Sequence, residues 1–118
     1  MKTAKEIQEN LPYFTGTETY FQYYFGIKFT DGIKYLADNA ECYWLINIIV
    51  SYQVDPKVKE EGFQVYKLKV NADKSALVEI TDGNKNILAK QDIEFTDFPL
   101  EEIEIWCIDN IVLLPSEY

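Results

Sequence analysis

Carboxylates are concentrated near the end of this 118-residue sequence. Residues 91–118 hold eight carboxylates and no basic side chain, whereas residues 1–90 hold 12 acids and 11 lysines. Closely spaced carboxylates can bind hard cations, act as general acids and bases, or attract a basic partner. The eight are Asp92, Glu94, Asp97, Glu101, Glu102, Glu104, Asp109 and Glu117.

Metal binding is the first chemistry to test. Asp92, Glu94 and Asp97 resemble a carboxylate cluster for a hard cation. However, apolar and polar positions alternate through residues 87–95, which predicts a strand with one solvated face. Asp82-Gly83-Asn84 resembles part of a calcium loop, but it lacks the distal Glu and fits a hairpin turn better. We therefore predict no metal site and no cofactor.

Catalysis lacks its usual residues in this sequence. The chain contains neither histidine nor arginine, so the commonest general base and the guanidinium fork are absent. Glu102 and Glu104 lie along one predicted strand, whereas acid–base pairs face each other across a cleft. The enzymatic alternative is an undescribed type that uses carboxylates, or a pair such as Tyr24 and Lys28, in a pocket lined by N-terminal aromatic residues. Neither GxGxxG nor GxxxxGK[ST] occurs, so no nucleotide-binding motif is present.

Aromatic residues are dense between residues 13 and 29 and could stack on nucleic-acid bases. Such proteins also need a positive groove, but residues 1–52 contain four lysines and six acids. We expect these rings to build a core or a protein interface, with no direct binding of nucleic acid. A homo-oligomeric structural protein that associates through this stretch is a further alternative.

Helices are predicted in the N-terminal half. Thr3 and Glu6 form a capping-box pattern that predicts a short helix before Pro12. Thr30 and Asp31 precede apolar residues at helical spacing up to Ala40, which predicts a second, amphipathic helix. Residues 44–52 continue this spacing and predict a central core helix, although their β-branched residues leave a strand as the alternative.

Strands are predicted mainly in the C-terminal half. Hairpin-length gaps separate the strand-like runs, so neighbouring strands are expected to pair antiparallel. The sequence therefore predicts one α+β domain over residues 1–118. It comprises an antiparallel sheet of about 4–6 strands packed against two or three helices. The runs are residues 63–70, 76–81, 87–95 and 102–114, the last folded back at Asp109-Asn110, with one or two further strands in 13–29.

Two further features bear on location. The longest uncharged run, residues 42–54, is 13 residues long and falls short of the ~20 that span a bilayer. Together with the lack of an apolar N-terminal stretch, this predicts a cytoplasmic protein that does not bind membranes. Cys42 and Cys107 have no metal-type spacing and are expected to be reduced and buried, with a disulfide between them left open.

The acidic surface is the strongest functional feature. Alternation places Glu102, Glu104 and Trp106 on one strand face, and Ile103, Ile105 and Cys107 on the other. The other acids extend this face if strands 87–95 and 102–108 are neighbours. A solvated face is one interpretation; the other is a surface that steers and holds a basic protein. The predicted partner-binding residues are Asp92, Glu94, Asp97, Glu101, Glu102, Glu104 and Trp106.

The favoured hypothesis is a small, acidic, non-enzymatic protein-binding module. Its basic partner would itself bind nucleic acid, with carboxylates standing in for phosphates. Such a protein would act as an inhibitor, of the anti-CRISPR or anti-defence kind that phages and mobile elements carry. This hypothesis requires no cofactor.

Three segments carry a resemblance to a known family. They are YFTGTE from Tyr13, FTDGIKYLADNAECYWLINIIVSYQ from Phe29, and TDFPL with the terminal LLPSEY. Together they resemble a family of small bacterial and phage proteins of unknown function. The resemblance implies a stand-alone, cytoplasmic, single-domain protein, often tied to mobile elements. It supplies no activity, cofactor or catalytic residue.

Overall fold

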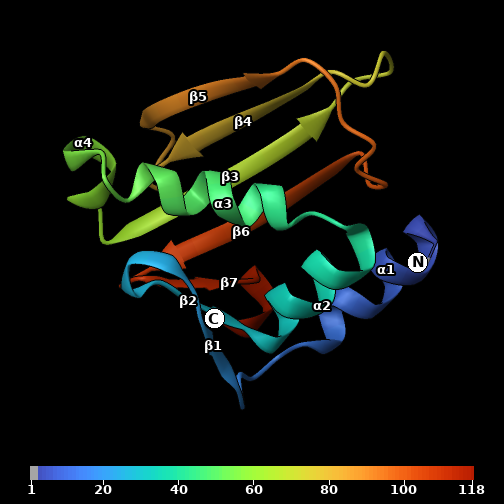
Figure 1. Cartoon of the computed structure of the whole chain (residues 1–118), viewed down its shortest axis with the longest axis horizontal. Coiled ribbons are helices and arrows are strands. Elements are labelled where there is room, and N and C mark those ends of the chain that lie inside the picture. The colour runs from blue at the N-terminus through green and yellow to red at the C-terminus, as the bar shows by residue number, and fades with distance from the viewer. Residues whose placement is uncertain (1–2) are drawn as a thin grey trace.

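A seven-stranded sheet runs through the computed structural model, which describes residues 3–118 (Figure 1). Its strand order is β1-β2-β7-β6-β3-β4-β5, so the last strand in the sequence lies inside the sheet. The chain therefore has the α+β class predicted from its sequence. The strands are β1 (Tyr20–Gln22), β2 (Lys28–Thr30), β3 (Phe63–Val70), β4 (Ala76–Thr81), β5 (Ile87–Ile93), β6 (Glu102–Ile108) and β7 (Ile111–Leu113).

The sheet is mixed, which corrects the prediction of an antiparallel sheet of about 4–6 strands. Strands β3 to β6 pair antiparallel, as their short connections indicate. Strand β2, however, pairs parallel with β7, and Lys28 lies opposite Ile111. Because these two segments are far apart in the sequence, no turn signal between them could reveal the pairing. The predicted reversal at Asp109-Asn110 is confirmed, since both residues have positive φ and join β6 to β7.

Helices form where capping signals were found. The Thr3 side chain accepts from the Glu6 amide, and the Thr30 side chain accepts from the Ile33 amide. The core helix predicted at residues 44–52 is confirmed, and the strand alternative is wrong. The helices are α1 (Ala4–Asn10), α2 (Asp31–Ala40), α3 (Tyr43–Tyr52) and α4 (Pro56–Lys59), with 3-10 turns at Leu11–Tyr13, Tyr24–Gly26 and Pro115–Glu117.

The hydrophobic core lies between α2, α3 and one face of the sheet, which we call the inner face (Figure 1). Leu36 and Ile49 from the helices and Leu68 and Ile105 from the sheet each retain at most 1% exposure. Full burial of each such side chain contributes about 1.5–3 kcal/mol before the entropy cost of folding. This core fixes which face of each strand points to solvent.

Three buried polar side chains in this core form hydrogen bonds with one another. Gln53 Nε2 donates to Gln64 Oε1 at 2.8 Å and to the Tyr66 hydroxyl at 2.8 Å. Tyr66 donates to Gln64 Oε1 at 2.6 Å, and burial raises the Tyr66 pKa well above its usual value. Mutual hydrogen bonding therefore offsets the cost of placing two amides and a phenol inside the core.

Strand β5 departs from its predicted pattern. The alternation predicted over residues 87–95 places Ile87 and Phe95 on one apolar face with Ala89 and Ile93. A register shift at Ile80/Thr81 turns Ile87 towards solvent, and β5 ends at Ile93. Phe95 lies beyond the strand and is 71% exposed. The expectation that Phe95 faces the core is therefore wrong.

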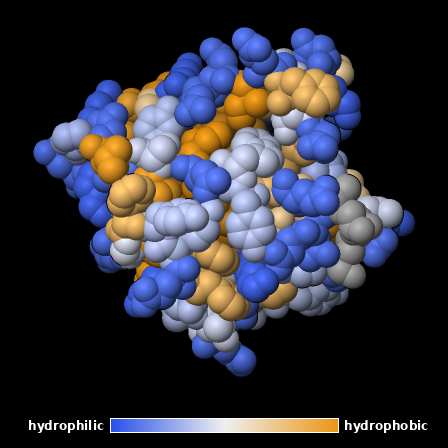
Figure 2. All heavy atoms as spheres, in the orientation of Figure 1, coloured by the Kyte–Doolittle hydropathy of each residue, from blue (hydrophilic) through white to orange (hydrophobic). Residues whose placement is uncertain are grey.

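The helix layer leaves part of the inner face uncovered. Figure 2 shows apolar atoms at the surface between α3 and strands β4 and β5. A hollow of about 260 Å³ lies beside this region and is lined by Trp44, Ile93 and Phe95, among others. None of the helices in residues 3–118 combines the length and the apolar composition of a membrane span.

Candidate functional site

The predicted acidic residues come together mainly at one end of the sheet. There the β3–β4 turn and the β5–β6 connection are held together, because the Thr96 amide donates to the Lys74 carbonyl at 2.9 Å. The Val70 amide likewise donates to the Glu101 carbonyl at 2.8 Å. We call this region the acidic end and define it by six exposed carboxylates: Asp73, Asp92, Glu94, Asp97, Glu101 and Glu102.

The acidic end is hollowed rather than flat. One hollow of about 490 Å³ is lined in part by Glu101, Glu102 and Pro99. A second, of about 440 Å³, is lined in part by Asp92 and Glu94. Lysines also line these hollows, namely Lys69 in both and Lys74 in the first. The six carboxylates outnumber these two lysines, so the region has a negative field.

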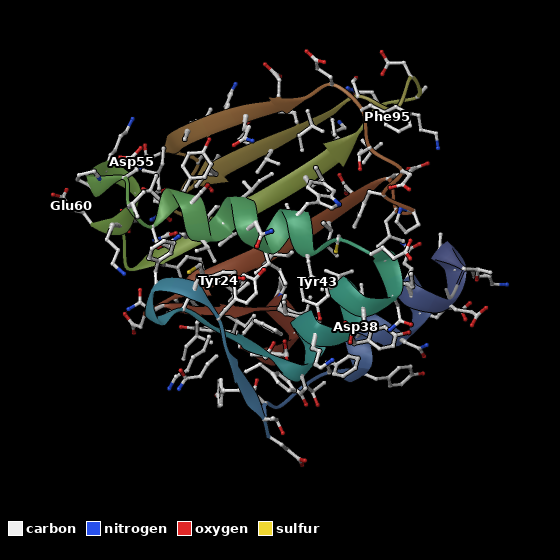
Figure 3. The ribbon with its side chains drawn as sticks, in the orientation of Figure 1. Tyr24, Asp38, Tyr43, Asp55, Glu60 and Phe95 are labelled. Carbon is white, nitrogen blue, oxygen red and sulfur yellow. The ribbon has the colours of Figure 1, made fainter. Side chains whose placement is uncertain are left out.

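Phe95 projects from the acidic end. Figure 3 shows this residue where the chain leaves β5, away from the α2 helix. Beyond it, Thr96, Phe98 and Leu100 are buried, and the Thr96 hydroxyl accepts from the Phe98 amide at 3.1 Å. This alternation turns Phe95 and Asp97 outward together. Phe95 lines a hollow with Asp97, and an exposed aromatic ring is the kind of residue that anchors protein interfaces.

Phe95 and Asp73 were missed at the sequence level. Phe95 fits the apolar alternation of residues 87–95, which predicts that its side chain faces the core. Because β5 ends at Ile93, the alternation does not continue to Phe95, and its side chain faces solvent instead. Asp73 belongs to a turn before β4, and nothing local indicates that this turn contacts the β5–β6 connection. Its pKa is lowered because the Ser75 side chain and amide donate to it. Asp73 thus remains ionised at neutral pH.

Glu104 and Trp106 lie on the sheet face opposite the core, which we call the outer face, away from the acidic end. Strands β3 and β4 separate β5 from β6, so the two acidic strands are not neighbours. Lys67 lies opposite Glu104, with Nζ 3.8 Å from Oε1, and Lys69 lies opposite Glu102. The extension of one carboxylate row from β6 onto β5 required these strands to be neighbours, and this condition is not met. Charges on the outer face alternate instead.

Trp106 belongs to an aromatic cluster on the outer face. Its ring centroid lies 4.9 Å from that of Phe63 and 5.4 Å from that of Tyr118. The indole Nε1 donates to Glu104 Oε2 at 2.8 Å. The predicted placement of Trp106 on the same face as Glu102 and Glu104 is confirmed. Phe63 and Trp106 line a hollow of about 360 Å³, together with Lys67, Glu79 and Glu104 among others.

The polar groups between α2 and α3 are poorly suited to catalysis. Figure 3 shows Asp38 and Tyr43 side by side, and Tyr43 donates to Asp38 while Lys34 donates at 2.7 Å. Burial and the Asp38 contact raise the Tyr43 pKa to about 12. The Lys34 hydrogen bond lowers the Asp38 pKa. Tyr43 therefore stays protonated at neutral pH, which disfavours a tyrosinate nucleophile at this position.

The other candidate groups for catalysis or metal binding are the Tyr24–Lys28 pair, the carboxylates and the two cysteines. Tyr24, paired with Lys28 in the enzymatic alternative, is 65% exposed on a 3-10 turn. Among residues 3–118, no group of three or more Cys, Asp or Glu side chains is arranged to hold a metal ion. Both cysteines are buried and form no disulfide, and burial raises the pKa of each thiol to about 12. Thiolate chemistry is therefore suppressed at neutral pH.

The C-terminal Glu117 forms a structural cluster with residues from distant segments. Its Oε1 accepts from the Thr30 hydroxyl at 2.6 Å and from the Leu114 amide at 3.0 Å. Its Oε2 accepts from the Gly32 amide at 3.3 Å and from the Thr17 hydroxyl at 3.4 Å. The carboxylate occupies the N-terminus of α2, where its charge is favourable. One buried residue thus joins the three segments on which the resemblance rests.

The fold defines a class: an α+β protein with a mixed seven-stranded sheet and its main helices on one face. More particularly, the chain belongs to a family of unknown function (DUF6876), whose match covers residues 5–118. The predicted resemblance to an uncharacterised family is thereby confirmed, and a bacterial or phage origin stays a prediction. No curated protein and no solved structure matches the chain.

Proposed function

We propose that this protein is a non-enzymatic protein-binding module whose acidic end engages a basic surface on a partner protein. The observation that carries the proposal is the exposed Phe95 ring, which lines one hollow with Asp97, next to two further hollows that exposed carboxylates line at the same end of the sheet. A ring anchors a partner by burial, whereas the surrounding charges select and orient it.

Electrostatics supports a basic partner. The protein carries a net charge of -9, and the acidic end concentrates much of it on two connected segments. At physiological ionic strength the Debye length is about 8 Å, so the field of clustered carboxylates exceeds that of scattered ones. Such a field accelerates encounter with a positive surface and repels nucleic acid itself.

The favoured partner is a nucleic-acid-binding protein. Its basic surface is already shaped for phosphates, and carboxylates on a rigid sheet end can occupy equivalent positions. Occupation of that surface would block nucleic acid and make this protein an inhibitor. A role against host defence, as an anti-CRISPR-like protein of a phage or mobile element, is the setting that we propose for it.

The test compares charge reversal at the acidic end with the same reversal elsewhere. After affinity purification of a partner from the native host, its dissociation constant is measured for Glu94→Lys with Glu101→Lys. The matched control is Glu6→Lys with Glu9→Lys on α1, where both residues are exposed. We expect at least a tenfold loss at the acidic end and a shallower salt dependence, with near-native binding for the control.

Phe95→Ala supplies a second variant that changes no charge. We expect weaker binding by about tenfold or more, through faster dissociation, with the salt dependence unchanged. Equal losses in the acidic-end and α1 variants would indicate a non-specific charge effect. That result, or native affinity in both acidic-end variants, would overturn the proposal.

A further inference from the structure

The outer face of strands β3 to β6 carries a row of alternating charges. Glu79 pairs with Lys90 across β4 and β5, and Lys67 lies between Glu79 and Glu104. We call these four residues the charged row; in strand order they are Lys90, Glu79, Lys67 and Glu104. Their side chains are 36–54% exposed. The row is therefore accessible and its net charge is zero.

Next to the charged row, the same face is mainly apolar. Moving along the strands away from the acidic end, the next register positions are Ile87, Thr81, Val65 and Trp106. Ile87 is 47% exposed, and Phe63 and Tyr118 extend the apolar region beside Trp106. We call this the apolar half of the outer face. Charge and apolar surface are thus segregated along the strand direction.

We propose that the outer face binds the outer face of a second copy of this chain. The two sheets would pack about 10 Å apart with their strands nearly aligned, as in a β-sandwich. The two-fold axis runs parallel to the strands and passes between β3 and β4. This rotation reverses the order of the strands and keeps each residue at its height along them.

The charged row is self-complementary under this rotation. Lys90 comes to lie over Glu104 of the second copy, and Glu79 over its Lys67. Each pair occurs twice by symmetry, as an isologous interface requires. Displacing the axis onto β3 or β4, by half the strand spacing of about 4.8 Å, places like charges opposite each other. The pattern therefore selects one register.

The apolar half also meets itself in this arrangement. Trp106 faces Ile87 of the second copy, and Val65 faces Thr81. An axis perpendicular to the strands would place the charged row either over apolar residues, which leaves charges desolvated and unpaired, or over itself with each charge opposite its own copy. A second copy therefore fits this face better than a uniformly basic protein, for which the neutral charged row offers no net attraction.

The rotation also brings the two acidic ends to the same end of the dimer. Asp92 then lies opposite Glu102 of the second copy, and their repulsion opposes association. Because of this repulsion, we expect a weak dimer with a dissociation constant on the order of micromolar. The proposal does not depend on a basic partner, since it rests on a different part of the sheet.

The experiment uses two complementary variants of the charged row. Lys67→Glu with Lys90→Glu makes the row wholly acidic, and Glu79→Lys with Glu104→Lys makes it wholly basic. Sedimentation velocity at about 0.15 M salt should show a dimer for the wild type and at least tenfold weaker association for each variant alone. An equimolar mixture of the two variants should form a heterodimer, which a folding defect could not produce.

Matched controls hold the net charge constant. The first control is Lys5→Glu with Lys57→Glu, at two exposed helix positions. It changes the net charge by the same amount as Lys67→Glu with Lys90→Glu, which we call the acidic-row variant; the opposite pair is the basic-row variant. Glu6→Lys with Glu9→Lys matches the basic-row variant. Both controls should dimerise within about threefold of the wild type. A monomeric wild type at about 500 μM, or a dimer unaffected by either row variant, would overturn the proposal. The latter result would assign association to another surface, such as the β5 edge.

Discussion

Gly32 shows how tightly the buried Glu117 cluster is packed. A Cβ atom at Gly32 would lie 2.6 Å from Glu117 Oε1 and 2.8 Å from Leu114 Cδ1. We expect Gly32→Ala to lower the free energy of unfolding by about 1–3 kcal/mol, because it forces the carboxylate away from its donors. Gly16→Ala is the control, since nothing lies within 4 Å of its added Cβ. Urea denaturation of both variants tests this; equal stabilities would contradict it.

The buried thiols give the stability a defined alkaline dependence. Burial raises the pKa of Cys42 and Cys107 from 9.0 to about 12, so the unfolded chain loses these protons first. Stability from this source is fully present below pH 9 and is lost as the pH rises towards 12. We expect the free energy of unfolding to fall over this range. Cys42→Ala with Cys107→Ala should fall less steeply in urea denaturation; an identical slope would contradict the assignment.

At the scale of elements, helix α2 ends on a residue with a strained backbone. Its C-cap Glu41 has φ 52° and ψ 48°, the left-handed conformation that glycine adopts without strain. We expect Glu41→Gly to raise the free energy of unfolding by about 0.5–1 kcal/mol. Glu60→Gly is the control, because this C-cap of α4 has φ -63° and gains nothing from glycine. Thermal denaturation in which both variants lose stability would refute this explanation.

Elements with local signals were the ones that the sequence predicted well. The Thr30 cap defined the start of α2, and Asp82-Gly83-Asn84 joins β4 to β5 as a turn with Gly83 at φ 87°. By contrast, β1 and β2 are three residues each, and their place in the sheet depends on β7. Such pairing is set by tertiary packing rather than by alternation or turns.

The sequence predicted most residues of the candidate site, but it did not predict how the strands arrange them. Five of the seven predicted partner-binding residues belong to the acidic end, whereas Glu104 and Trp106 lie farther along the outer face. Alternation correctly gave the faces of β6. Alternation could not show that Lys67 and Lys69 lie between the acidic strands. It predicts the face on which each side chain lies, but not the order of the strands in the sheet.

For the whole molecule, local stability should differ between the central strands of the sheet and its β1 edge. Strands β3 and β6 share seven paired positions and lie between other strands, whereas β1 is a three-residue edge strand. We therefore expect amide hydrogen exchange to be slowest in β3 and β6 and fast in β1, through local opening. Exchange mass spectrometry of the native protein measures this. Equal protection across the sheet would show a single cooperative unit instead.

The parallel pairing of Lys28 with Ile111 has a consequence for synthesis. Translation proceeds at about 5–20 residues per second, so β2 waits roughly 4 to 17 s before β7 has been made. During that interval the aromatic segment around Phe21 and Phe29 has no neighbouring strand on its β7 side. We therefore expect the nascent chain to expose these aromatic residues until β7 completes the sheet.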